Sequence, residues 1–278
     1  PPPPPPPPPP PHFFFQAHPA PPEPLWSRGL GDVYKRQVLD KKKTPFLSTI
    51  FSITSHEPYI IPKKYEGMFD KGDLEMHQCV GYTDFALKKF FESCKKSDWF
   101  DDTIFIFTAD HGNQTYYPFY KKMVNRFANP LMIYKPNSNL VGVDKRLASH
   151  MDIFPTVADL IDYPKPFRSW GRSLISDNTA EPFVVNYFSG GYYIMDENYI
   201  CVHNGFEAIG FYELNDKNFE DNIIDQKNQL MVDLEKKCSL FLENYFNCIW
   251  FASSNPYKRI SYFFSQNFFL VIVSAWKP

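Results

Sequence analysis

The chain has 278 residues, of which 44% are hydrophobic and 22% are charged, a balance that is typical of a globular protein with a buried core. A formal net charge of −2 argues against a nucleic acid as partner, and no apolar run reaches the length of about 18 residues that a membrane-spanning helix requires. The five cysteines show no CxxC spacing, which argues against a zinc ribbon and against a dense disulfide framework.

Residues 1–37 are expected to lie outside the fold. Fifteen of the 27 prolines fall within the first 24 residues, and such a run can adopt the polyproline II conformation but cannot pack a core. Residues 27–37 resemble translated adaptor sequence, and no basic start followed by an apolar run marks a signal peptide. We therefore expect the native chain to begin near Val38, in the middle of a domain.

From residue 38 onward, strand patterns alternate with helix patterns. Residues 44–53 are rich in β-branched and aromatic side chains, which predicts a strand, and residues 74–95 carry apolar side chains at helical spacing. Residues 103–108 form an almost wholly apolar run, typical of a central strand that is covered on both faces. Residues 131–134 predict another short strand, and residues 152–162 predict a helix.

This alternation predicts an α/β fold with a mostly parallel sheet flanked by helices. The helix over residues 152–162 has Asp152 as its candidate N-cap. After about residue 180 the pattern changes to short strands joined by turn residues, which predicts a small antiparallel meander, and residues 227–249 predict an amphipathic closing helix. The periodicity is lost from residue 251, so we expect residues 251–278 to be an uncertain tail.

The strongest chemical signal is the sequence Thr-Ala-Asp-His-Gly that ends the apolar strand over residues 103–108. Functional groups of open α/β sheets gather at the carboxyl ends of the strands. Where the backbone turns there, the side chains of Asp110 and His111 can converge on one cation, and Gly112 permits a sharp bend. A carboxylate and an imidazole suit a divalent metal of borderline hardness. An ordinary strand-end turn also uses Asp and Gly, and the buried strand in front of the motif favours the metal site.

Four further segments accompany this motif in a fixed order. They are Ser55-His56-Glu57-Pro58-Tyr59, the Gly-Tyr-Thr-Asp-Phe-Ala-Leu of residues 81–87, the Met-Asp-Ile-Phe-Pro-Thr of residues 151–156 and the Trp-Gly-Arg-Ser-Leu of residues 170–174. Together with Asp110-His111-Gly112, the series resembles the sulfatase-type catalytic domain of the lipoteichoic-acid-synthase and phosphoglycerol-transferase group of the alkaline-phosphatase superfamily. The resemblance covers residues 44–250.

The resemblance implies an alkaline-phosphatase-like fold and a role for three side chains. Asp110 and His111 would ligate a divalent metal (Mn, Mg, Zn or Ca), and His56 would bind the phosphate or sulfate group or assist the leaving group. The expected organisation is a non-native segment over 1–37, the C-terminal part of a catalytic domain over 38–180, strands and a closing helix of the same domain over 181–250, and the tail over 251–278.

The implied function is that of a fragment of a metal-dependent phosphoglycerol transferase or phosphodiesterase, acting on an anionic phospholipid or on another phosphate or sulfate ester. One alternative is sulfate-ester hydrolysis, and another is a non-catalytic fragment or pseudoenzyme. The group's Thr, Ser or formylglycine nucleophile would lie upstream of Val38, so we expect this chain alone to be inactive; a Cys-x-Pro-x-Arg signature for formylglycine does not occur. The parent protein would be anchored by N-terminal membrane helices, with its catalytic domain outside the cytoplasm.

Several other residues are further candidates for positions near the site. His150 precedes the helix over residues 152–162, where capping or packing is the simpler role. Arg126 is the nearest basic candidate for binding an anion, and the amides of Asn113 and Gln114 are candidates for oxyanion donors. Two residues of the last motif, Trp170 and Arg172, are expected to pack and to pin their loop.

Overall fold

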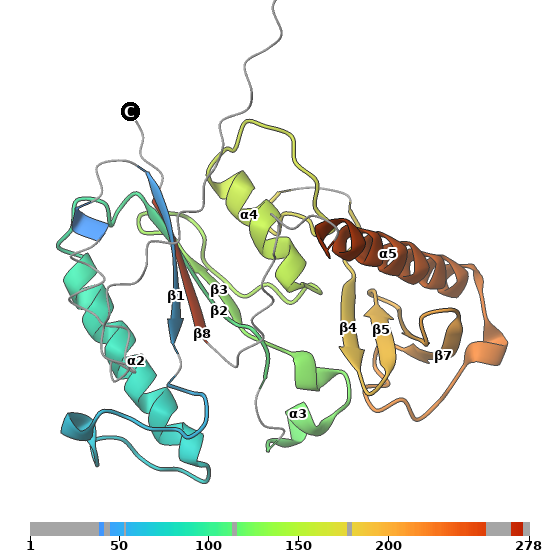
Figure 1. Ribbon diagram of the computed structural model, residues 1–278, viewed down its shortest axis with the longest axis horizontal. Coiled ribbons are helices and arrows are strands. Elements are labelled where there is room, and N and C mark those ends of the chain that lie inside the picture. The colour runs from blue at the N-terminus through green and yellow to red at the C-terminus, as the bar shows by residue number, and fades with distance from the viewer. Residues whose placement is uncertain are drawn as a thin grey trace, which may run out of the picture.

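The computed structural model describes residues 39–41, 45–52, 54–112, 116–176, 180–253 and 268–274 (Figure 1). The α-helices in these ranges are α2 (Glu75–Cys94), α3 (Pro118–Lys121), α4 (Ile153–Leu160) and α5 (Gln229–Ser253). The strands are β1 (Phe46–Ser52), β2 (Thr103–Ala109), β3 (Leu131–Tyr134), β4 (Val184–Phe188), β5 (Gly191–Met195), β6 (Tyr199–His203), β7 (Ala208–Glu213) and β8 (Phe268–Ser274). They form two sheets, with the orders β1-β8-β2-β3 and β4-β5-β6-β7.

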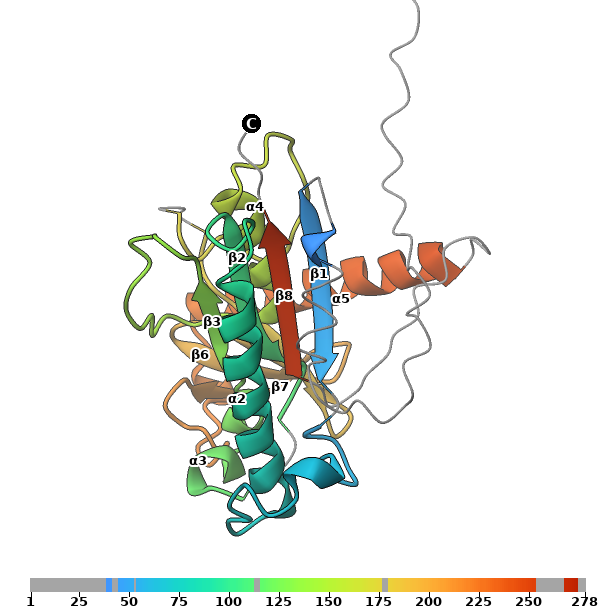
Figure 2. The ribbon, with the colours of Figure 1, turned by 90° about the vertical axis from the view of Figure 1, so that its left-hand side faces the viewer.

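The α/β class is confirmed, but the expected mostly parallel arrangement of the first sheet is wrong for the strands that the structure describes. β8 pairs antiparallel with both β1 and β2, and β3 pairs antiparallel with β2. β1 and β2 therefore do run in the same direction, as their helical connection through α2 requires, but β8 lies between them (Figure 2). This strand comes from residues 251–278, which the sequence pattern left as an uncertain tail.

The register of β8 aligns the carboxyl ends of β1 and β2. Ser52, the last residue of β1, and Ala109, the last residue of β2, both lie opposite Phe268, one on each side. Strands two positions apart in a sheet are separated by about 10 Å. The segments that follow β1 and β2 therefore leave the sheet at the same end, about 10 Å from each other.

β2 is the central strand of the layered core because both of its faces are covered. Its residues Thr103 to Thr108 are all buried. Phe105 and Phe107 belong to a cluster with Phe90 of α2, whereas Ile104 and Ile106 pack with α4 on the opposite face. Figure 1 shows α2 and α4 on the two sides of this sheet. The prediction of a doubly covered strand is confirmed.

The start of α4 confirms the predicted N-cap position and adds a second cap before it. A short 3₁₀ turn over His150–Asp152 precedes the helix, and the Ser149 hydroxyl accepts the N–H of Met151 at 3.1 Å. Asp152 instead returns its carboxylate to the Ser149 N–H at 2.9 Å, the reciprocal half of a capping box. Asp152 thus holds the predicted N-cap position of α4, but its side chain makes no capping bond to α4, because the helical turns begin three residues earlier at Ser149.

The segment around Gly171 is pinned onto this capping box, as expected for Trp170 and Arg172. The backbone N–H of Arg172 donates to the buried Asp152 carboxylate at 2.8 Å, and its guanidinium donates to the Leu147 carbonyl at 3.0 Å. The Trp170 ring packs on Phe241 of α5 with ring centroids 4.8 Å apart.

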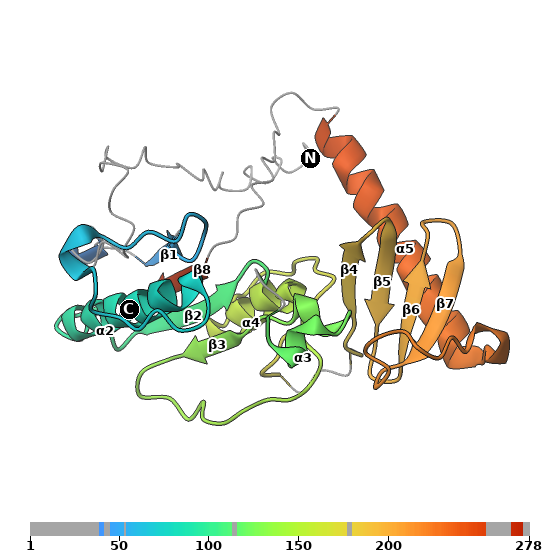
Figure 3. The same ribbon diagram turned by 90° about the horizontal axis from the view of Figure 1, so that it is seen from below.

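The second sheet is the predicted antiparallel meander, closed by α5 (Figure 3). One face of α5 packs on β5 and β6 through a buried cluster that includes Ile194, Cys201, Met231 and Cys238. Burial raises the pKa of Cys201 and Cys238, so these side chains stay protonated and pack as small apolar groups. Among the helices of the described ranges, none has the length and apolar composition needed to cross a bilayer.

The last residue of β6 is a buried, neutral histidine. His203 is fully buried; its Nδ1 accepts the Gly205 N–H at 3.0 Å and its Nε2 lies 3.3 Å from the Ser239 hydroxyl. Because a backbone N–H can only donate, Nδ1 must be unprotonated and the proton belongs on Nε2. Burial lowers the pKa of His203 below its ordinary value of 6.5, although the negative charges of Glu235 and Glu207 act to raise it.

We expect His203 to make the protein less stable as the pH falls below about 6.5. Below that pH, His203 binds a proton in the unfolded chain but not yet in the folded chain. The free energy of unfolding therefore decreases until the pH passes the lowered pKa of the folded state. Urea unfolding at pH 7.5 and 5.5 measures the loss. In His203→Asn, whose side-chain oxygen can still accept the Gly205 N–H, this part of the pH dependence should vanish; equal losses in the two proteins would contradict the assignment.

Candidate active site

Asp110 and His111 lie where the backbone turns away from β2. One carboxylate oxygen, Asp110 Oδ1, accepts the N–H of His111 at 3.0 Å, and the other, Oδ2, lies 4.0 Å from His111 Nε2. On the other side of the imidazole, Nδ1 lies 2.8 Å from the Gly112 carbonyl oxygen. A carbonyl can only accept, so Nδ1 carries the proton and Nε2 offers its lone pair on the side of the carboxylate.

This pair of donor atoms fits a shared divalent cation. Nitrogen and oxygen ligands lie about 2.1 Å from zinc or similar metals, so two ligands of one cation are at most about 4.2 Å apart. The 4.0 Å between Asp110 Oδ2 and His111 Nε2 falls within that limit but exceeds the separation of about 3.4 Å between two ligands of a tetrahedral metal, so the two side chains would have to draw closer around such an ion. The hydrogen bond from Nδ1 to the Gly112 carbonyl orients the ring in the way that metal-binding histidines are usually held. Within the described ranges, no group of three or more His, Cys, Asp or Glu residues is placed to hold a metal ion.

Neighbouring backbone and amide groups hold the turn. The side-chain amide of Asn129 donates to the Asp110 carbonyl at 3.5 Å, and a Cβ on Gly112 would lie 3.1 Å from the Arg126 carbonyl. The sequence motifs gave no sign of Asn129, although its place just before β3, the partner of β2, is the signal that could have found it. Arg126, the predicted anion-binding residue, makes a cation–π contact instead: its guanidinium lies 4.2 Å from the centre of the Phe188 ring.

His56 follows β1 at the same end of the sheet. It is half-buried, four residues beyond the end of β1, and its Nδ1 lies 2.7 Å from the Glu57 carbonyl oxygen. By the same reasoning as for His111, that nitrogen donates and Nε2 has a free lone pair. Because the ends of β1 and β2 are aligned, the segment that contains His56 leaves the sheet at the same end as the segment that contains Asp110 and His111.

His150 reaches the end of β2 from a different part of the chain. Its Nε2 lies 3.4 Å from the hydroxyl of Thr108, two residues before Asp110. The following turn is capped by Ser149 and not by His150. His150 instead contacts β2, the strand that precedes the candidate ligands. The predicted oxyanion donors Asn113 and Gln114 lie outside the described residues.

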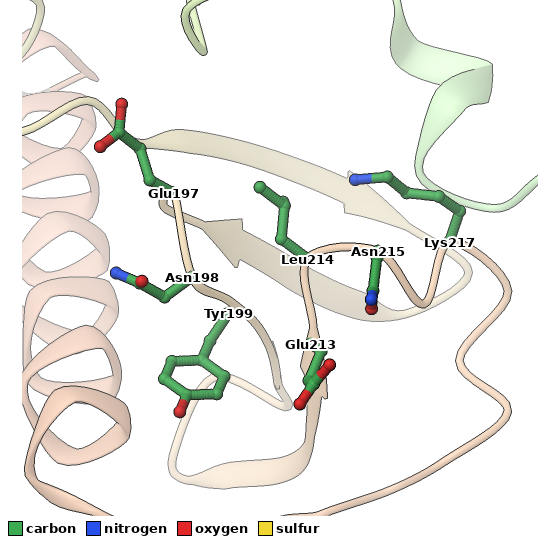
Figure 4. Close-up of a pocket in the computed structure, with 7 residues that line it drawn as sticks. All are labelled: Glu197, Asn198, Tyr199, Glu213, Leu214, Asn215 and Lys217. Atoms are coloured by element: carbon green, nitrogen blue, oxygen red, sulfur yellow. The ribbon is translucent and has the colours of Figure 1, made fainter.

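The pocket drawn in Figure 4 is a separate feature of the meander. It has a volume of about 610 Å³ and lies between the β5–β6 turn and the loop after β7. Its lining residues are Glu197, Asn198, Tyr199, Glu213, Leu214, Asn215 and Lys217. His56, Asp110 and His111 do not line it, so this cavity is not where the motif chemistry would occur.

Comparison with known proteins gives a consistent picture. The Sulfatase family model matches residues 18–163, a range that begins within 1–37 and includes Asp110 and His111. Lipoteichoic acid synthases of Staphylococcus aureus strains USA300 and NCTC 8325 are each 22% identical over 178 residues, which is 58% of this chain and 27% of the relative. The chain thus spans about a quarter of the length of these relatives.

A solved structure supports the fold. A protein in the alkaline phosphatase superfamily from Vibrio parahaemolyticus superposes with a TM-score of 0.61 at 24% sequence identity, and the match covers 79% of this chain and 53% of that chain. The family model alone spans more than half of the chain. The chain therefore belongs to the sulfatase family and has the fold of the alkaline-phosphatase superfamily.

Proposed function

We propose that this chain contributes part of the metal site of an enzyme that transfers or hydrolyses a phosphoester, with phosphoglycerol as the transferred group. The observation that supports the proposal is the convergence of Asp110 Oδ2 and His111 Nε2 to 4.0 Å at the end of a buried strand. The similarity to lipoteichoic acid synthases favours a membrane phospholipid as donor and a parent protein anchored in the membrane with its catalytic domain outside the cytoplasm.

Asp110 and His111 would hold a divalent metal that supplies charge neutralisation for the substrate oxygens and for the nucleophile. The anionic carboxylate of Asp110 matches a cation, and the neutral imidazole of His111 presents its lone pair from Nε2 because Nδ1 is held by Gly112. The carboxylate suits Mn, Mg and Ca, whereas the imidazole nitrogen favours Zn.

His56 would act on the substrate without ligating the metal. Its Nδ1 is held by the Glu57 carbonyl, so Nε2 can accept a proton from, or when protonated donate one to, an oxygen of the bound phosphate. The alignment of the β1 and β2 ends supports this role, since His56 follows β1 by four residues at the end of the sheet where Asp110 and His111 follow β2.

Sulfate-ester hydrolysis is the second candidate, and the name of the matching family favours it. The two candidates require the same metal pair and differ in the group that is transferred. Turnover of a phosphodiester and of an aryl sulfate by a full-length enzyme that contains this chain separates them. Exclusive turnover of the sulfate would overturn the phosphoglycerol assignment.

Metal binding by the 278-residue chain tests the proposed site. We expect Asp110→Asn and His111→Gln each to lower the affinity for Mn²⁺ by about tenfold or more, because each removes a ligand rather than an outer partner. Titration followed by the electron paramagnetic resonance of free Mn²⁺ measures the affinity, and circular dichroism shows that the variants fold.

Asp233→Asn on α5 is the matched control, since Asp233 is an exposed carboxylate that pairs with Gln229. Its affinity should equal that of the parent chain. Folded Asp110→Asn and His111→Gln proteins with unchanged affinity would sink the metal assignment and would favour a non-catalytic role for the chain.

A further inference from the structure

Residues 116–122, Tyr-Tyr-Pro-Phe-Tyr-Lys-Lys, form an exposed segment that we call the aromatic–lysine ridge. The exposed fractions of Tyr116, Tyr117 and Phe119 are 44%, 48% and 55%, and Lys121 and Lys122 are also exposed. The ridge contains α3, which lies at the lower edge of the molecule in Figure 1. Aromatic rings that are left open to water beside lysines call for an explanation, because folding would normally bury them.

Contacts within the protein hold the ridge in its exposed position. The rings of Tyr116 and Tyr117 meet edge to face at 5.1 Å, and those of Phe119 and Tyr120 do so at 5.0 Å. The Tyr117 hydroxyl lies 3.3 Å from His77 Nε2, and its ring stacks on the same imidazole. The aromatic groups are therefore already ordered, which reduces the entropy lost when they bind a surface.

The ridge and the segment that follows it are positively charged, although the chain as a whole is acidic and Asp73 and Glu75 lie near His77. Residues 116–127 contain Lys121, Lys122 and Arg126 and no Asp or Glu, against a net charge of −2 for the chain. Lys217 extends the basic region: its carbonyl accepts the Val124 N–H at 3.3 Å, and burial together with the charge of Lys122 lowers its pKa. The neighbouring Asp216 keeps its negative charge, which the N–H groups of Glu220 and Asp221 stabilise, and so it opposes Lys217 at that end of the region.

We propose that the aromatic–lysine ridge docks on the surface of an anionic lipid bilayer. Tyrosine and tryptophan are enriched at the level of lipid headgroups, phenylalanine occurs on the apolar side of interfacial helices, and exposed lysines are attracted to acidic lipids. A folded protein partner fits less well, because a stable protein–protein interface takes about 20–30 residues from each side and the ridge supplies seven.

Docking there would hold the turn that carries Asp110 close to the bilayer. The segment that follows the ridge returns to the Asp110 turn, where the Arg126 carbonyl lies against Gly112 and Asn129 donates to the Asp110 carbonyl. This consequence rests on the proposed function and would give the enzyme its phospholipid at the bilayer surface. The docking itself does not depend on metal or turnover, so the two can fail independently.

Co-sedimentation of the full chain with vesicles tests the proposal. The parent chain should bind vesicles of phosphatidylglycerol and phosphatidylcholine more tightly than vesicles of phosphatidylcholine alone, and salt should weaken the binding. The double variant Lys121→Gln/Lys122→Gln should lose about 25-fold in affinity for the anionic vesicles, at about fivefold for each lysine. Tyr116→Ser/Phe119→Ser should lose about tenfold or more, because it removes apolar area from the bound face.

Two matched variants act as controls. Lys95→Gln/Lys96→Gln removes two exposed lysines just beyond the opposite end of α2, and Phe206→Ser removes a ring that is 94% exposed on the meander. Both should bind like the parent chain. The proposal is overturned if the ridge variants bind as tightly as the parent, or if the parent binds neutral vesicles equally well. It is also overturned if sedimentation velocity shows a dimer that the ridge substitutions dissolve, since a second copy would then cover this surface.

Discussion

Replacing Gly171 by alanine should destabilise the protein by about 3 kcal/mol or more. A Cβ at this position would lie 2.0 Å from the carbonyl oxygen of Met151, 2.2 Å from its carbonyl carbon and 2.6 Å from the Asp152 nitrogen. These are backbone atoms of the capping turn before α4, so no flexible side chain can move aside. Relief of the clash must separate the Gly171 segment from α4.

That separation would break a set of buried hydrogen bonds at once. The Asp152 carboxylate would lose the Arg172 N–H at 2.8 Å, and the Thr156 hydroxyl would lose the Leu174 N–H at 3.0 Å. The Ser173 hydroxyl also bonds the Asp159 carboxylate at 2.6 Å. Each buried group left unsatisfied costs about 1–3 kcal/mol, so the total effect exceeds the steric term alone.

Urea unfolding followed by circular dichroism measures the effect, and Gly81→Ala is the matched control. Gly81 lies inside α2, where the nearest atoms to a new Cβ are those of the Phe69 side chain at 3.4 Å. A helical Gly→Ala change without a clash should be neutral or should stabilise by about 0.5–1 kcal/mol. Equal stability of the Gly171→Ala and parent proteins would mean that the close approach to Met151 is not a real constraint.

The local elements of the fold could be predicted because their signals are local. The apolar run over residues 103–108 requires two covering layers, and the structure supplies α2 and α4. The neighbours of β2 could not be predicted in the same way, since the intervening strand comes from residues 268–274, more than 150 residues further along the chain. The position of the helix start could be predicted at Asp152, whereas the capping box that Ser149 and Asp152 form on the preceding 3₁₀ turn was missed, although their spacing is its signal.

The candidate site divides along the same line. Asp110 and His111 are adjacent in sequence and follow a buried strand, so their convergence needed only the knowledge that the backbone turns there. The contact of His150 with Thr108 spans 42 positions and depends on how α4 covers the sheet. A complete ligand set depends on such distant pairings, which no periodicity encodes. For that reason the sequence predicts the pair and leaves the remaining ligands open.

The second large effect is expected from Phe105→Ala, which should cost about 3–5 kcal/mol of the free energy of unfolding. Phe105 is fully buried on the face of β2 that packs against α2. Its ring lies 4.9 Å from Phe91 and 5.4 Å from Phe100, centroid to centroid, so truncation removes the middle of an aromatic cluster. Phe206→Ala, which removes an equally large ring that is 94% exposed, should change the stability by no more than about 0.5 kcal/mol.

The same variant tests whether the core of β2 and the candidate metal site form one cooperative unit. Asp110 follows directly on β2, so melting of this strand should release the fixed orientation of the Asp110 and His111 side chains and, under the proposed function, weaken Mn²⁺ binding. In a urea titration of Phe105→Ala, circular dichroism and Mn²⁺ binding should therefore be lost at one midpoint, lower than that of the parent chain. Metal binding that outlasts the loss of secondary structure would show that the Asp110–His111 pair does not need the strand to hold its geometry, and the argument from strand to site would fail there.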